Sequence, residues 1–170
     1  NSGTGLYINE VKRGDHQFTT VMENYDYDHG IVGNIENTIF LRTNYKAPHW
    51  RLVKFNHDNP GPENWIEVIP ESEYPLNSVS ITGGKLLVKY SKDVSSCLYV
   101  YSLDGKMETE VELPTVGTAS GFGGKQNDSE VFYNFTSFAY PPTIFRYDIE
   151  ADTSTLFRQS KVEVDFSLYE

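Results

Sequence analysis

Ser120 is the first residue that could act as a nucleophile, because glycines stand near it in the string Gly117 to Gly121. A serine hydrolase of the α/β type carries its serine in a G-x-S-x-G turn between a strand and a helix, which exposes the hydroxyl beside oxyanion donors. In this chain the first glycine is one residue too far from the serine, and the surrounding residues favour a strand. We interpret Ser120 as a turn residue and predict no catalytic residue in this string.

Cys97 offers a second nucleophile, for which His49 or His57 would be the base. It stands at the start of an apolar strand, and a cysteine in that position is usually buried and structural. As the only cysteine of the chain it can form no internal disulfide. We therefore predict a structural role for Cys97, and a reducing compartment is slightly favoured.

The remaining candidates for metal or cofactor binding lack the spacing that such sites require. The histidines lie in polar loops or turns without a repeated ligand interval: His16, His29, His49 and His57. Asp26 and Asp28 resemble the first ligands of a calcium loop whose other ligands and terminal glutamate are missing. No helix follows the glycines between residues 117 and 124, so no phosphate-binding loop is expected. We predict no metal site and no cofactor.

Trp50 and Trp65 leave two interpretations open. An indole ring offers a large apolar face with one hydrogen-bond donor, which suits a binding surface. Packing against neighbouring sheets is the alternative, and it is the one that we favour.

Charge and hydropathy exclude several classes of partner. The net charge is −10, from 24 acidic and 14 basic residues, and the basic residues are scattered rather than clustered. This distribution argues against a nucleic-acid surface and favours a solvated acidic exterior. No apolar run approaches membrane-spanning length, so no membrane partner is expected.

The elements that would position any of these residues are short strands. We expect strands at residues 6–9, 18–22, 31–35, 38–43, 51–55, 65–69, 79–82, 86–90, 98–103, 109–113, 119–122, 131–135, 144–147 and 155–158. In residues 130–148 the residues Val131, Tyr133 and Phe135 alternate with Phe132 and Asn134, which is the period of a pleated strand. Two prolines at 141 and 142 are expected to end the pairing there.

Glycine-containing pairs mark tight hairpin turns between these strands. Gly83 and Gly84 form one pair, and Asp104 and Gly105 form another. Tight hairpin turns require positive φ at such positions, which glycine adopts without strain.

The strands repeat in groups of four. Phe40, Leu87 and Phe132 hold the same place in successive groups, 47 and then 45 residues apart. Four strands at this interval are typical of a β-propeller blade. We predict an all-β fold, a partial β-propeller of about three and a half four-stranded antiparallel blades. The blades are residues 25–71, 72–114 and 115–160, preceded by the end of another blade in residues 1–24.

Three and a half blades do not close a ring, since propellers typically have about four to eight. A sheet face would be left exposed at each end. We expect the chain to be a piece of a larger protein, with self-association of the isolated segment as the alternative.

The strand-rich segments carry a resemblance to a known family. The string EVFYNFTSFAYPPTIFRYD at residues 130–148 resembles the last propeller blade of the prolyl oligopeptidases. Three upstream strings are similar to the preceding blades of that family, in the same order: TIFLRTNYKAPHWRLVKFN at 38–56, NWIEVIPESE at 64–73 and LLVKYSKDVSSCLYVYSLDG at 86–105. The FTSF phrase followed by proline, residues 135–142, favours the branch that cleaves after proline. The end of the chain, in residues 161–170, resembles the strand that leads back toward the catalytic domain.

This resemblance implies a serine peptidase that cleaves short peptides on the carboxyl side of proline, in the cytoplasm or alternatively in the periplasm. Members of the family carry a Ser-Asp-His triad on an α/β-hydrolase domain, which a seven-bladed propeller covers. The chain matches only the later blades, so no catalytic residue is transferred to it. Its implied partners are that catalytic domain and short proline-containing peptides.

The role left to the segment is that of a lid and size filter over the active site. The competing interpretation is a non-enzymatic propeller that serves as a protein-interaction scaffold. A carbohydrate-acting propeller enzyme ranks last, because no acidic residue recurs at one position across the repeats.

Overall fold

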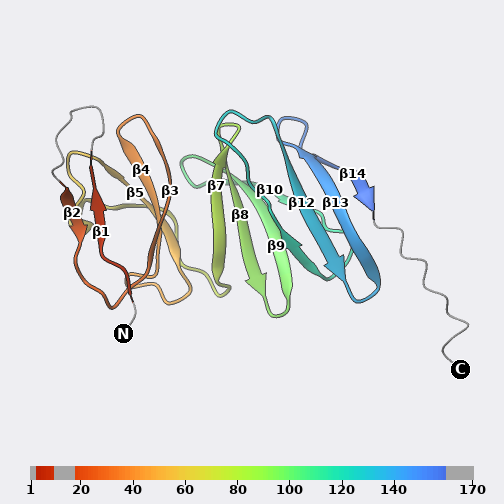
Figure 1. Cartoon of the computed structure of the whole chain (residues 1–170), viewed down its shortest axis with the longest axis horizontal. Helices are drawn as coiled ribbons and strands as arrows, with labels where there is room; N and C mark the ends of the chain where they lie inside the picture. The colour runs from red at the N-terminus through yellow and green to blue at the C-terminus, as the bar shows by residue number, and fades with distance from the viewer. Residues whose placement is uncertain (1–2, 10–17, 160–170) are drawn as a thin grey trace, which may run out of the picture.

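The computed structural model describes residues 3–9 and 18–159, and almost all regular structure there is β-strand (Figure 1). The strands are β1 (Leu6–Ile8), β2 (Thr19–Met22), β3 (His29–Ile35), β4 (Thr38–Thr43), β5 (Arg51–Asn56), β6 (Ile66–Ile69), β7 (Leu76–Thr82), β8 (Lys85–Lys92), β9 (Ser95–Ser102), β10 (Met107–Val111), β11 (Thr118–Ser120), β12 (Glu130–Ser137), β13 (Tyr140–Asp148) and β14 (Thr153–Gln159). A short 3-10 helix, η2 (Pro62–Asn64), lies in the loop between β5 and β6.

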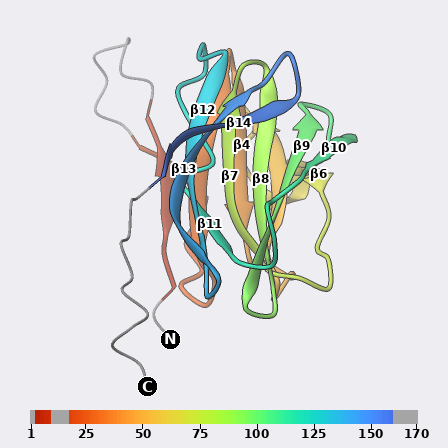
Figure 2. The same cartoon turned by 90° about the vertical axis from the view of Figure 1, so that its right-hand side faces the viewer.

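The strands form antiparallel sheets of consecutive strands. Three sheets have four strands each, in the orders β3-β4-β5-β6, β7-β8-β9-β10 and β11-β12-β13-β14, and β1 pairs with β2. The sheets follow one another in chain order along the molecule in Figure 1, and they stand one behind another in Figure 2. The prediction of an all-β partial propeller of about three and a half blades is confirmed. The tail predicted as a connecting strand, residues 161–170, lies outside the described residues.

Both faces of the middle strands are buried because their residues alternate between two cores. In β8, Leu86 and Val88 face the sheet β3–β6, whereas Leu87 faces the sheet β11–β14. In β4, Phe40 and Leu41 divide in the same way between the cores on either side. A near-continuous apolar strand is therefore what this position between two sheets requires, since each residue has a neighbouring sheet to contact.

Each core lies between two adjacent sheets. The core between the second and third complete sheets is the richest in aromatic rings; Phe122, Tyr133, Phe135, Phe145 and Tyr147 all contribute. Tyr133 and Phe145 stack with their ring centroids 5.4 Å apart. Such rings bury large apolar areas, which makes this core a principal source of stability.

The hairpin turns confirm the glycine predictions. Gly83 and Gly84 have φ of 58° and 72°, and Gly105 has φ of 84°. A Cβ atom at Gly105 would also overlap the carbonyl oxygen of Val68 in the preceding sheet. Glycine at 105 is therefore required both by the turn and by the packing of one sheet against the next.

The prediction that two prolines end the strand pairing was wrong. Pro141 and Pro142 lie inside β13, and Ser137 pairs with Tyr140 beyond them. A register shift between Phe135 and Ser137 accommodates the prolines, because neither has a ladder partner within the described part of the chain. Ser120 is likewise not a turn residue, since it ends β11 and Gly121, with φ of 81°, makes the turn after it.

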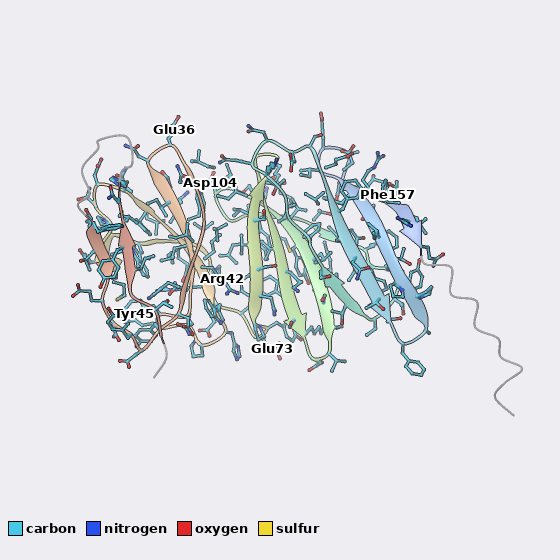
Figure 3. All side chains as sticks on the ribbon, in the orientation of Figure 1. Glu36, Arg42, Tyr45, Glu73, Asp104 and Phe157 are labelled. Carbon is cyan, nitrogen blue, oxygen red and sulfur yellow. The ribbon has the colours of Figure 1, made fainter. Side chains whose placement is uncertain are left out.

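The turns divide between two ends of the molecule, which are marked by labelled residues in Figure 3. The Glu36 end holds the turns after the first and third strands of each sheet. The Tyr45 end holds the turns after the second strands and the links from one sheet to the next.

We expect Leu87→Ala to lower the free energy of unfolding by about 2–5 kcal/mol, because Leu87 is fully buried and its truncation leaves a cavity. Leu156→Ala is the matched control, since 56% of Leu156 is exposed, and it should change stability by less than about 0.5 kcal/mol. Urea unfolding followed by circular dichroism measures both. Equal losses in the two variants would contradict the placement of Leu87 between two sheets.

Candidate functional site

The first strands of the complete sheets lie on the side where the sheets converge. Each of β3, β7 and β11 pairs with a neighbour along one edge and is the first strand of its sheet. β3 lies beside β7, and the loop after β11 reaches β3 through the bond that Gln126 Nε2 donates to the Asn34 carbonyl, at 3.0 Å. These strands therefore form the inner side of the segment, which in a propeller faces the central channel.

Side chains from one sheet hydrogen-bond to the backbone of the next along this inner side. The hydroxyl oxygens of Ser80 and Thr82 on β7 each lie 3.3 Å from the carbonyl of Gly124 and also accept from its N–H. Away from the inner side, the hydroxyl of Ser96 on β9 accepts from the N–H of Ala119 on β11 at 3.0 Å. Such bonds fix the spacing of neighbouring sheets because they satisfy polar groups that the packing has removed from water.

Arg42 is the main clamp between the first and second complete sheets. It projects from β4, lies between the two sheets in Figure 3, and donates to the carbonyls of Leu76, at 2.9 Å, and Asn77. Its guanidinium carbon lies 3.9 Å from the centre of the Trp50 ring, which places the planar cation against the aromatic face. Desolvation lowers the pKa of Arg42, and Asp28 opposes this.

The inner strands offer little acid-base chemistry. Their sequences are HGIVGNI, LNSVSIT and TAS, without an aspartate, glutamate, lysine or arginine. A general acid, a carboxylate pair and a phosphate clamp all need such residues. These strands consequently supply no carboxylate, lysine or arginine to the inner side, where the apolar Ile31 is also exposed.

His29, at the start of β3, is the titratable residue of these strands. Its Nδ1 lies 2.8 Å from the Thr43 hydroxyl, and its ring meets the Trp65 ring edge-on at 6.1 Å. Its Nε2 is buried without a hydrogen-bond partner among the described residues. Burial lowers the pKa of His29 from its ordinary value, and the charge of Asp28 partly opposes this shift.

The structure does not bring Cys97 together with His49 or His57, the residues considered above as a nucleophile and its base. Cys97 is half-buried on β9 and packs against the core between the first and second complete sheets. His49 instead places Nδ1 3.1 Å from the Ser72 carbonyl, and His57 places Nδ1 3.5 Å from Asp58. Ser120 is exposed on β11, and His16 lies outside the described residues.

Two further observations concern metals and membranes. Among residues 3–9 and 18–159, no group of three or more histidine, cysteine, aspartate or glutamate side chains could hold a metal ion. No helix in the described part of the chain is long and apolar enough to cross a membrane.

Both tryptophans pack against other rings and core residues. Trp50 lies under Arg42, and Trp65 stacks on Phe55 at 6.0 Å while donating from Nε1 to the Pro60 carbonyl at 2.9 Å. Packing is therefore the interpretation that the structure supports.

Sequence reasoning missed Arg42, although a lone cation inside the apolar run of β4 was the signal that could have drawn attention to it.

The fold and its inner side define the class of protein first: this is a segment of a β-propeller whose sheets are joined by packing and polar contacts. The family model described as the N-terminal β-propeller domain of prolyl oligopeptidase matches residues 1–160. The chain thus belongs to the prolyl oligopeptidase family.

Relatives and solved structures agree with this assignment. The prolyl endopeptidase of Elizabethkingia miricola is 36% identical over 162 residues, which cover 95% of this chain and 23% of that protein. The prolyl endopeptidase of Dictyostelium discoideum is 31% identical, with 84% of this chain and 20% of that protein covered. The chain thus spans about a quarter or less of the length of these relatives.

Similar structures come from the same family. One, from a study of inter-domain dynamics in two prolyl endopeptidases, superposes with a TM-score of 0.90 at 28% identity and covers 96% of this chain and 24% of its own. Prolyl oligopeptidase B of Galerina marginata, bound to a 35mer hydrolysis and macrocyclization substrate, has a TM-score of 0.79 at 26% identity, with 88% of this chain and 21% of its own covered.

We expect Arg42→Lys to reduce the free energy of unfolding by about 1–3 kcal/mol, because a lysine cannot both stack on Trp50 and satisfy two carbonyls. Arg158→Lys, at an exposed position on β14, is the matched control and should be close to neutral. Urea unfolding measures the difference. A neutral Arg42→Lys variant would show that the clamp adds nothing to stability.

We expect the pKa of His29, measured by NMR titration of its ring, to lie below 6.5. The unfolded chain then takes up the proton before the native chain does, so stability is complete above pH 6.5 and falls as the pH drops through and below that value. His29→Gln should weaken this dependence between about pH 7.5 and about pH 5. A native pKa at or above the ordinary value would contradict the burial of the ring.

Proposed function

We propose that this chain is part of the propeller of a serine peptidase that cleaves short peptides on the carboxyl side of proline. The observation that carries the proposal is the match of residues 1–160 to the propeller domain of the family. The names of its relatives support it, because prolyl endopeptidases of a bacterium and a slime mould are both similar across most of this chain.

In this proposal the segment itself performs no bond cleavage. The nucleophile, its base and the oxyanion donors belong to an α/β-hydrolase domain of the parent protein, which is the main partner of the propeller. The neutral inner strands support this division of labour, because they offer no carboxylate or cation to a reacting bond.

The segment acts as a lid and size filter. Sheets that share buried cores and are joined by Arg42 and the Ser80 and Thr82 bonds resist separation, so a folded protein cannot push between them. An extended peptide can reach the active site by a narrow channel or by hinging of the two domains. Inner strands without a carboxylate, lysine or arginine let such a peptide pass without a strong preference for charge.

The test uses the natural polypeptide that contains this chain, captured from source cells with an antibody raised against residues 1–170. We expect a protein several times heavier than 19.4 kDa that reacts with a fluorophosphonate probe. It should cleave a fluorogenic peptide of about ten residues after proline, and a folded protein with exposed prolines should remain intact.

A control reaction replaces the proline of the peptide with alanine and should proceed much more slowly. A polypeptide near 19.4 kDa without labelling would overturn the proposal and leave an interaction scaffold. Equal cleavage of the folded protein and the short peptide would remove the size-filter role and keep the peptidase.

A further inference from the structure

A row of polar side chains crosses the first complete sheet at the Tyr45 end. His29 on β3 pairs with Thr43 on β4, and Thr43 pairs with Arg51 on β5. Residues paired in this way point to the same face of a sheet. Leu41 and Val53, two residues away on β4 and β5, belong to the core that this sheet shares with β1 and β2. The polar row therefore lies in the N-terminal seam, by which we mean the contact of β1 and β2 with the first complete sheet.

His29 joins three segments in this seam. Its backbone N–H donates to the Thr4 hydroxyl oxygen at 3.1 Å, which holds the residues that lead into β1. Its ring nitrogen Nδ1 lies 2.8 Å from the Thr43 hydroxyl, and that hydroxyl also accepts from the N–H of Tyr45 at 3.0 Å. The edge of the ring meets Trp65, which directly precedes β6. A movement of this one ring therefore disturbs the entry to β1, the β4–β5 turn and the start of β6 together.

The buried ring has no place for a second proton. A neutral imidazole has one nitrogen that donates and one that accepts, whereas both nitrogens donate in the protonated form. Nδ1 can accept from the Thr43 hydroxyl only while it carries no proton. Nε2 is buried and has no hydrogen-bond partner within the described part of the chain. Protonation thus leaves a positive charge on a buried nitrogen without an acceptor, a cost that disappears when the ring turns out into water.

The charges around the ring come from each of the segments that surround it. Asp28, directly before His29, favours the protonated form, whereas burial has the larger effect and lowers the pKa of His29. Arg51, at the far end of the polar row, carries a positive charge on the same face, and Glu67 on β6 pairs with it at 3.1 Å. Further titratable groups stand in the adjoining segments: Asp26 and Tyr27 before β3, and Tyr45 and Lys46 in the β4–β5 turn. Asp28 is the group among these whose charge opposes the effect of burial.

We propose that His29 is an acid-sensitive latch of the N-terminal seam. Near neutral pH the uncharged ring stays between Thr43 and Trp65, and the seam is closed. As the pH falls below 6.5, a ring that has turned into water binds a proton more readily than the buried ring does, so the open seam gains in population. The inference concerns how the sheets of the propeller separate, and it is independent of the peptidase activity proposed above.

Hydrogen exchange of the complete natural polypeptide, followed by mass spectrometry at about pH 7.5 and about pH 5.5, tests the latch. Each rate is divided by that of the same peptide in the unfolded polypeptide, which removes the intrinsic effect of pH on exchange. We expect residues 3–8 and 43–46 to exchange about three- to tenfold faster at the lower pH on this relative scale. Residues 85–92 in β8, away from the seam, should not change. An absence of any acid response in residues 3–8 and 43–46 would overturn the proposal.

His29→Gln assigns the acid response to this ring. Glutamine can still hydrogen-bond to Thr43 but takes up no proton, so this variant should lose the response. His57→Gln is the matched control, since His57 lies beside Asp58 in the β5–β6 loop at the Glu36 end, and it should keep the full response. A response of undiminished size in His29→Gln would show that another group titrates, and the latch would be wrong.

A second variant keeps the histidine and moves its titration. Asp28→Asn removes the carboxylate that favours the protonated ring, so the acid response should keep its size and shift to lower pH. A purely structural role of Asp28 predicts a different result, namely a seam that is loosened equally at both pH values. That result, or a response that stays at the same pH, would contradict control of the seam by the charge of His29.

Discussion

Burial of the faces that adjacent sheets turn toward one another is the constraint on which the rest of the structure depends. A four-stranded sheet alone would leave one apolar face in water, so the second complete sheet is stable only between its neighbours, with Leu86 facing one and Leu87 facing the other. The alternation along β8, the close approach of Gly105 to Val68 and the Arg42 clamp all follow from this stacking. It also explains why the last sheet of the segment exposes Phe132 and Phe157, because no further sheet of the described residues covers this face. Phe157 is labelled in Figure 3.

Because the sheet faces are apolar, the polar contacts between neighbouring sheets are made at the edges of the sheets. Hydroxyls and amides of the inner strands satisfy the backbone of the neighbouring sheet, as Ser80 and Thr82 do for Gly124. These contacts are neutral and local. A segment built in this way holds neighbouring sheets at a fixed spacing, as a propeller requires.

Local patterns in the sequence determined the strands, their grouping in fours and the turns at Gly83, Gly84 and Gly105, because alternation and positive φ are properties of neighbouring residues. Predictions from these local patterns were wrong or incomplete where contacts between distant residues determine the structure. Pro141 and Pro142 remain in β13 because a register shift in the paired strand accommodates them. Arg42 is a clamp only because β7 brings two carbonyls to it from residues 34 and 35 positions away. The sharing of one end by turns as distant as those at Val94 and Phe138 also needed the tertiary structure, since these turns lie at the same end only after the sheets have formed.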